Sequence, residues 1–98
     1  MPYELRLSQV LKKQRWKVKI FDKESLWEEP HVSVICKTKV WRWSLREQAF
    51  MNSDPDPNDV PASVVTAMIQ AYEELCTAWD ELFPRNPVQD AEEEDQQL

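Results

Sequence analysis

The chain of 98 residues contains no glycine. A phosphate-binding P-loop, a dinucleotide-binding G-x-G-x-x-G turn and a G-x-S-x-G nucleophile turn all need backbone geometry that only glycine tolerates. The sequence therefore excludes these three kinds of site. It also contains a single histidine and two cysteines without a CxxC pair, so no metal-ligand spacing is recognisable and we expect no cofactor.

Long hydrophobic runs are also missing. No stretch approaches the roughly 18 apolar residues that a membrane helix needs. The basic, polar amino terminus does not resemble a signal peptide, so we expect a cytoplasmic protein without a membrane partner. Cys36 and Cys76 each lie within an apolar pattern, which favours buried free thiols in a reducing compartment over a disulfide or a metal site.

The charge that is present is unevenly distributed along the chain. The formal net charge is −6, but residues 1–47 carry eleven lysines and arginines against six acids. Residues 48–98 carry one arginine against twelve acids. The simplest interpretation is solvation of both halves together with attraction between them.

The clearest pattern lies between Pro61 and Phe83. Apolar residues recur there at steps of three and four, the period of one helix face, and Pro84 ends the pattern. We predict one long amphipathic helix whose interface is filled by Trp79. Residues 88–98 are acidic and have little to bury, which predicts a single domain over residues 1–87 followed by a disordered acidic tail.

Upstream of this helix the period changes to two. Apolar residues alternate with polar ones over residues 15–21, 31–36 and 39–45, which predicts three strands, the last two joined by a reversal at Lys37 and Thr38. Residues 2–13 fit either a short strand or a helical turn capped by Ser8, and we favour a strand followed by a turn. The predicted fold class is therefore α+β, with a small antiparallel sheet of three to four strands packed on one long C-terminal helix.

Two groups of residues could carry a function. His31 could act as an acid or base, but it lacks an obvious partner, which favours a polar strand-start residue that forms local hydrogen bonds. Lys39, Trp41, Arg42 and Trp43 form an aromatic and basic cluster that could stack bases and neutralise phosphates if it were exposed. Alternation places both tryptophans on one face and Arg42 on the other, which favours tryptophans in the core. The basic face of Arg15, Lys17, Lys19 and Arg42 is then a solvated or partner-facing surface.

Three short motifs carry a resemblance to a known family. Glu29-Pro-His-Val-Ser-Val34, Trp41-Arg42 and the helical segment from Leu75 to Leu82 with Trp79 are similar to a bacterial family of small domains of unknown function. Members of that family carry a Pro-Pro-His-x-His strand and are often encoded beside a second small protein in toxin–antitoxin-like pairs. The resemblance spans residues 15–83 and implies an α+β fold and a protein partner. This chain has Ser33 in place of the second histidine and Glu29 in place of the first proline, so a role that needs two histidines is not carried over.

These observations leave three hypotheses about function. The first is a non-enzymatic interaction or regulatory module, one member of a two-gene pair, because no catalytic constellation is present. The second is a nucleic-acid binder, or a small ribonuclease-like toxin, that uses the basic face and the paired tryptophans, although the acidic net charge opposes binding to phosphates. The third is homodimerisation through a sheet edge or a leftover apolar helix surface.

Overall fold

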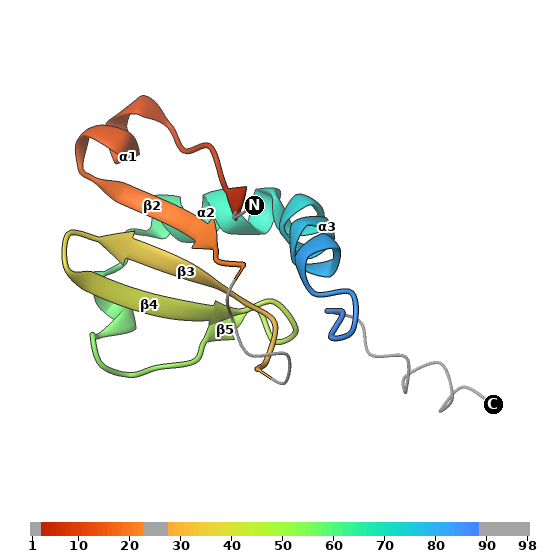
Figure 1. Cartoon of the computed structure of the whole chain (residues 1–98). Helices are drawn as coiled ribbons and strands as arrows, with labels where there is room; N and C mark the ends of the chain where they lie inside the picture. The colour runs from red at the N-terminus through yellow and green to blue at the C-terminus, as the bar shows by residue number, and fades with distance from the viewer. Residues whose placement is uncertain (1–2, 23–27, 89–98) are drawn as a thin grey trace.

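The computed structural model describes residues 3–22 and 28–88 of the chain. Within these ranges the fold is α+β, as the sequence predicts, with helices packed against an antiparallel sheet (Figure 1). The elements in chain order are β1 (Tyr3–Glu4), α1 (Gln9–Lys13), β2 (Trp16–Ile20), β3 (His31–Cys36), β4 (Lys39–Ser44), β5 (Ala49–Phe50), the 3-10 helix η1 (Pro57–Asp59), α2 (Ala62–Gln70) and α3 (Tyr72–Leu82).

The sheet is a meander in which the strands pair in sequence order, β1-β2-β3-β4-β5. The three central strands lie where the alternation predicts them. The sheet has five strands, however, and not the three to four expected, because both edges carry a two-residue strand. In β5, Phe50 pairs with Trp43, but two residues are too few to show a period of two. At the other edge, both alternatives for the N-terminal segment are realised, since Tyr3–Glu4 is a strand and the Ser8 side chain caps α1.

The single long helix predicted over residues 61–83 is wrong. The helix is broken at Ala71, whose φ and ψ of −101° and 20° depart from helical values, and it divides into α2 and α3. The buried positions Val64, Met68 and Leu75 keep a helical spacing across the break, so the apolar period does not reveal it. The break lets α2 lie behind the sheet while α3 turns away along its end (Figure 1).

The core lies between the helices and the sheet face that holds the tryptophans. Trp41 and Trp43 are each 1% exposed, and Trp79 from α3 is fully buried, as predicted. Trp16 lies against Trp41 with a ring-centroid separation of 5.5 Å. Other core residues contributed by the strands are Val18, Ile20, Val32 and Val34. Of the predicted tail, residues 88–98, only Val88 is described, and it is buried with the core.

No helix within the described ranges is long and apolar enough to cross a membrane.

Candidate functional site

The face of the sheet opposite Trp41 and Trp43 carries one row, His31 and Ser44, that is buried with the His31 ring against Trp79, and two further rows across the strands. The register pairs Ile35 with both Lys17 and Val40, and it pairs Ser33 with both Lys19 and Arg42. Residues paired directly across antiparallel strands project on the same face, so both rows point away from the tryptophan core. We call the exposed or half-exposed members of these rows the basic sheet face: Lys17, Lys19, Ile35, Val40 and Arg42.

One row places the cation Lys17 beside two apolar side chains, Ile35 and Val40, and the other holds Lys19 and Arg42 on either side of the buried Ser33. Val40 is 44% exposed, near the start of β4 where β5 does not pair with it. Lys19 Nζ lies 3.8 Å from Glu4 Oε1, and Arg42 Nη1 lies 3.3 Å from Glu28 Oε1. Among the described residues, Lys17 has no carboxylate partner. Both ion pairs are partly solvated, so each contributes little to stability.

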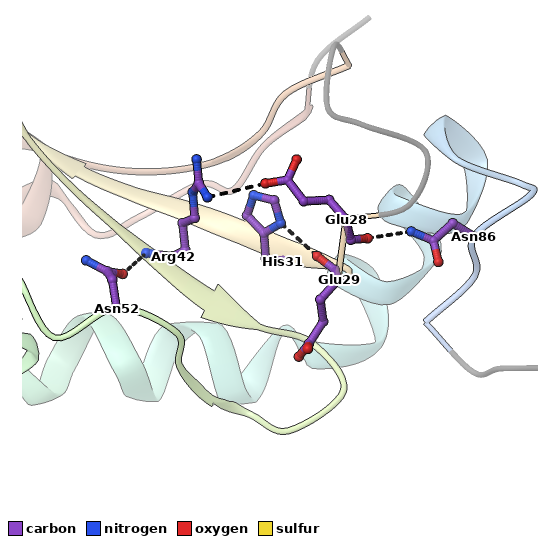
Figure 2. Close-up of polar contacts among 6 residues, drawn as sticks. All are labelled: Glu28, Glu29, His31, Arg42, Asn52 and Asn86. Atoms are coloured by element: carbon purple, nitrogen blue, oxygen red, sulfur yellow. Dashed lines mark hydrogen bonds and ion pairs between the residues drawn. The ribbon is translucent and has the colours of Figure 1, made fainter.

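His31 is not on an accessible surface. Only 1% of it is exposed, and its ring lies 5.6 Å from the Trp79 ring. Its Nδ1 is 2.8 Å from the backbone carbonyl oxygen of Glu29, an acceptor, so the proton lies on Nδ1 (Figure 2). The hydroxyl of Ser44, the cross-strand partner of His31, donates to the Glu29 carboxylate. This arrangement confirms the interpretation of His31 as a strand-start residue with a local hydrogen bond.

Trp41 and Trp43 do not form a stacking surface, which corrects their inclusion among the candidate binding residues. Both project into the core because the alternation of β4 turns them toward the helices. The Trp41 Nε1 donates to the Asp56 carbonyl oxygen at 3.0 Å, so even its polar atom has an internal partner. Lys39 is exposed but shares its sheet face with these tryptophans, across from Cys36, so it is separated from Arg42.

A network that the sequence does not predict holds Glu28 next to Arg42. The Asn86 side-chain amide donates to the Glu28 carbonyl, and the Asn52 side chain accepts from the backbone N–H of Arg42 at 2.8 Å (Figure 2). The Asn86 carbonyl in turn accepts from Trp79 Nε1 at 2.7 Å. The segment after α3 therefore fixes one boundary of the basic sheet face. The partners are separated by up to 58 residues in sequence, and no local pattern identifies such contacts.

A small basic depression lies at the other boundary. It has a volume of about 270 Å³ and is lined by Lys12, Arg15, Lys17, Ile35 and Lys37. The period of two predicts Arg15 and Lys17 as basic-face residues but does not place Lys12 and Lys37 beside them. Lys12 is on α1 and Lys37 is in the β3–β4 turn, so only the pairing of β2 with β3 brings them together.

The described residues contain no group of three or more His, Cys, Asp or Glu side chains arranged to hold a metal ion. Cys36 and Cys76 are free thiols, as expected, but both are half-buried and not fully buried. Burial is the main cause that raises the pKa of the Cys76 thiol above its ordinary value, and the charges of Asp80 and Glu73 add to it. A raised pKa lowers the thiolate fraction, so Cys76 is poorly suited to act as a nucleophile.

Comparisons with family models, curated proteins and solved structures found no match to this chain.

Proposed function

We propose that this chain is a non-enzymatic protein-interaction module that binds an acidic segment of a partner protein on the basic sheet face. The observation that carries the proposal is the row Lys17, Ile35 and Val40, in which an exposed valine and a half-buried isoleucine lie beside a cation that has no carboxylate partner among the described residues. Apolar contacts supply affinity in such a surface, while the cations supply orientation and association rate. The family resemblance is in keeping with this proposal, because it implies a partner encoded beside this chain.

A protein partner fits this face better than a single-stranded nucleic acid. Binders of single strands combine cations with aromatic rings on which the bases stack. None of the five residues of the basic sheet face is aromatic, and Trp41 and Trp43 are buried on the other side. The net charge of −6 also repels a phosphate backbone at long range, whereas it affects a local contact with a short acidic segment less.

The test uses a synthetic acidic peptide that alternates Glu with Leu, and a control peptide in which Lys replaces Glu. Binding is followed by fluorescence anisotropy at about 0.05 M and about 0.5 M salt. Lys17→Glu should weaken binding of the acidic peptide roughly tenfold, because it reverses the charge beside Ile35 and Val40. Arg85→Glu makes the same change of charge at an exposed position after α3 and should leave binding unchanged.

Two measurements distinguish a packed interface from attraction between charges alone: the salt dependence of the affinity and the effect of a substitution at Val40. Part of the affinity should persist at the higher salt, and Val40→Ser should remove that persistent part. Equal weakening by Lys17→Glu and Arg85→Glu would contradict the proposal. A preference for oligonucleotides over the acidic peptide would contradict it as well.

A further inference from the structure

The basic depression is built by two turns that the sheet register brings together. Trp16 pairs with Cys36, so the residue before β2, Arg15, and the residue after β3, Lys37, lie at the same end of the sheet. The α1–β2 connection and the β3–β4 turn lie next to each other at this end (Figure 1). Lys12 reaches the depression from the last turn of α1, and Lys17 and Ile35 line it from the basic sheet face.

Both turns hold a cation in a backbone conformation that ordinarily belongs to glycine. Arg15 has a φ of 72° and Lys37 a φ of 58°. Residues with a Cβ avoid this left-handed region, and when they occupy it the strain often coincides with a functional position. Among the described residues only Gln48 shares the feature, so two of three such positions line one depression. Glycine would relieve the backbone at both positions but would remove the cations.

The charge in the depression is unbalanced. Four of its five lining residues are lysine or arginine, and none is acidic. No described carboxylate forms an ion pair with any of these four cations. Four cations in so small a space repel one another, and a bound anion relieves that repulsion. A phosphoryl group carries close to two negative charges and three acceptor oxygens, so it can engage several of these donors at once and offsets more positive charge than a carboxylate, which has one charge and two oxygens.

We propose that this depression binds a phosphoryl group, with Arg15 and Lys37 as its main ligands and Lys12 and Lys17 as supporting cations. This proposal rests on the proposed function only for the source of the ligand. If the partner protein carries a phosphorylated side chain, the phosphoryl group would lie in the depression while the partner's acidic segment lies on the basic sheet face. A free phosphorylated small molecule offers the same chemistry.

The test measures binding of sodium pyrophosphate by NMR titration at constant ionic strength, with sodium chloride as the reference. Resonance shifts should concentrate at residues 12–17 and 35–38. Arg15→Gly and Lys37→Gly should each weaken pyrophosphate binding roughly tenfold, because each removes one charge-assisted contact. Both variants should unfold at the same temperature as the native chain or at a higher one, because glycine accepts the left-handed angles. Loss of binding therefore cannot be attributed to misfolding.

Gln48→Gly is the matched control, since it makes the same backbone change at the third left-handed position, which does not line the depression. It should leave pyrophosphate binding unchanged. Lys13→Gln controls for the lost charge, because Lys13 is exposed on the same helix as Lys12 but does not line the depression. Shifts spread over all lysines, or equal weakening by the controls, would overturn the proposal.

A second arm of the experiment identifies the source of the phosphoryl group. A peptide with one phosphoserine in an acidic segment is compared with its unphosphorylated form. A preference for the phosphopeptide that Lys37→Gly abolishes assigns the ligand to the partner, whereas retained pyrophosphate binding without that preference assigns a small molecule. Absence of pyrophosphate binding overturns this site and leaves the interaction module standing, because Val40→Ser and the Leu-containing peptide test the latter independently.

Discussion

The guanidinium group of Arg46 donates hydrogen bonds to the backbone carbonyl oxygens of Pro87 and Val88, at 2.8 and 2.9 Å. The second of these contacts spans 42 residues of sequence and ties the segment after α3 to the end of β4. The backbone N–H of Val88 also donates to an Asp80 carboxylate oxygen at 2.9 Å, and the Val88 side chain is 4% exposed. Val88 is therefore an integral part of the fold.

Shortening the chain tests this role of Val88. A chain that ends at Val88 should unfold at the same temperature as the full chain. A chain that ends at Asn86 should be about 2 kcal/mol less stable, because it loses a buried valine and the Arg46 contacts. In a domain of this size that loss corresponds to a fall of roughly 10 °C in Tm, measured by circular dichroism. Equal Tm values for the two shortened chains would show that the contact contributes nothing.

Trp79 offers a second test of the same end of the fold. Its ring is stacked on Phe83 with centroids 4.2 Å apart, and its Nε1 donates to Asn86. Trp79→Ala should lower the free energy of unfolding by about 3–5 kcal/mol, since it leaves a large cavity. Trp79→Phe keeps most of the ring and loses the hydrogen bond, so it should cost roughly 1–3 kcal/mol. Urea unfolding followed by circular dichroism measures both, and an unshifted transition in Trp79→Ala would contradict this packing.

The sequence predicts the parts of this fold that depend on local periodicity. Alternation places β3 correctly, puts Val32 and Val34 in the core and separates Trp41 and Trp43 from Arg42, but it does not predict the burial of His31 and Ser33 on the other face. The break at Ala71 is not predictable in this way, because neither proline nor glycine marks it and the apolar spacing continues through it. It is set by packing, since α3 must turn to bring Trp79 over His31.

The two candidate sites also differ in whether local periodicity predicts them. The basic sheet face follows from a period of two within single strands, so Lys17, Lys19 and Arg42 could be named from sequence. The depression requires the register between β2 and β3, which brings Lys12 and Lys37 together from segments that are not neighbours in sequence. Short-range patterns carry no information about register when the connecting loop is long.

The raised pKa of Tyr72 predicts that the folded protein loses stability at alkaline pH. Its hydroxyl donates to the Leu45 carbonyl, and burial, followed by the contact with Cys76, raises its pKa from 10.0 to about 12. The folded state therefore holds this proton more tightly than the unfolded state does. The resulting stabilisation is fully present below pH 10 and is lost as the pH rises toward 12. Tyr72→Phe should show a shallower loss of stability over this interval in urea unfolding at several pH values. Parallel pH curves for the two proteins would contradict the assignment.

Cys76 should react slowly with iodoacetamide in the folded protein. Because the pKa of the Cys76 thiol is raised, its thiolate fraction at pH 8 is below that of an ordinary thiol. The single-cysteine variant Cys36→Ser should therefore be alkylated more slowly in the folded state than in urea, with a midpoint displaced to higher pH. Mass spectrometry gives both rates, and the unfolded protein is the reference. A rate in the folded state equal to that in urea would show that burial does not protect the thiol.

The last prediction concerns the acidic residues beyond Val88. Residues 89–98 contain five acids, so their removal changes the net charge from −6 to −1. If these acids compete for the basic sheet face, a chain that ends at Val88 should bind the acidic peptide several-fold more tightly at about 0.05 M salt, and the gain should disappear at about 0.5 M, where charges are screened within a few ångströms. A full-length chain with Gln at the five acidic positions of residues 89–98 keeps the length but loses the charge. It should bind the acidic peptide with the same affinity as the shortened chain. Equal affinities of the native and shortened chains would show that these acids act only on solubility.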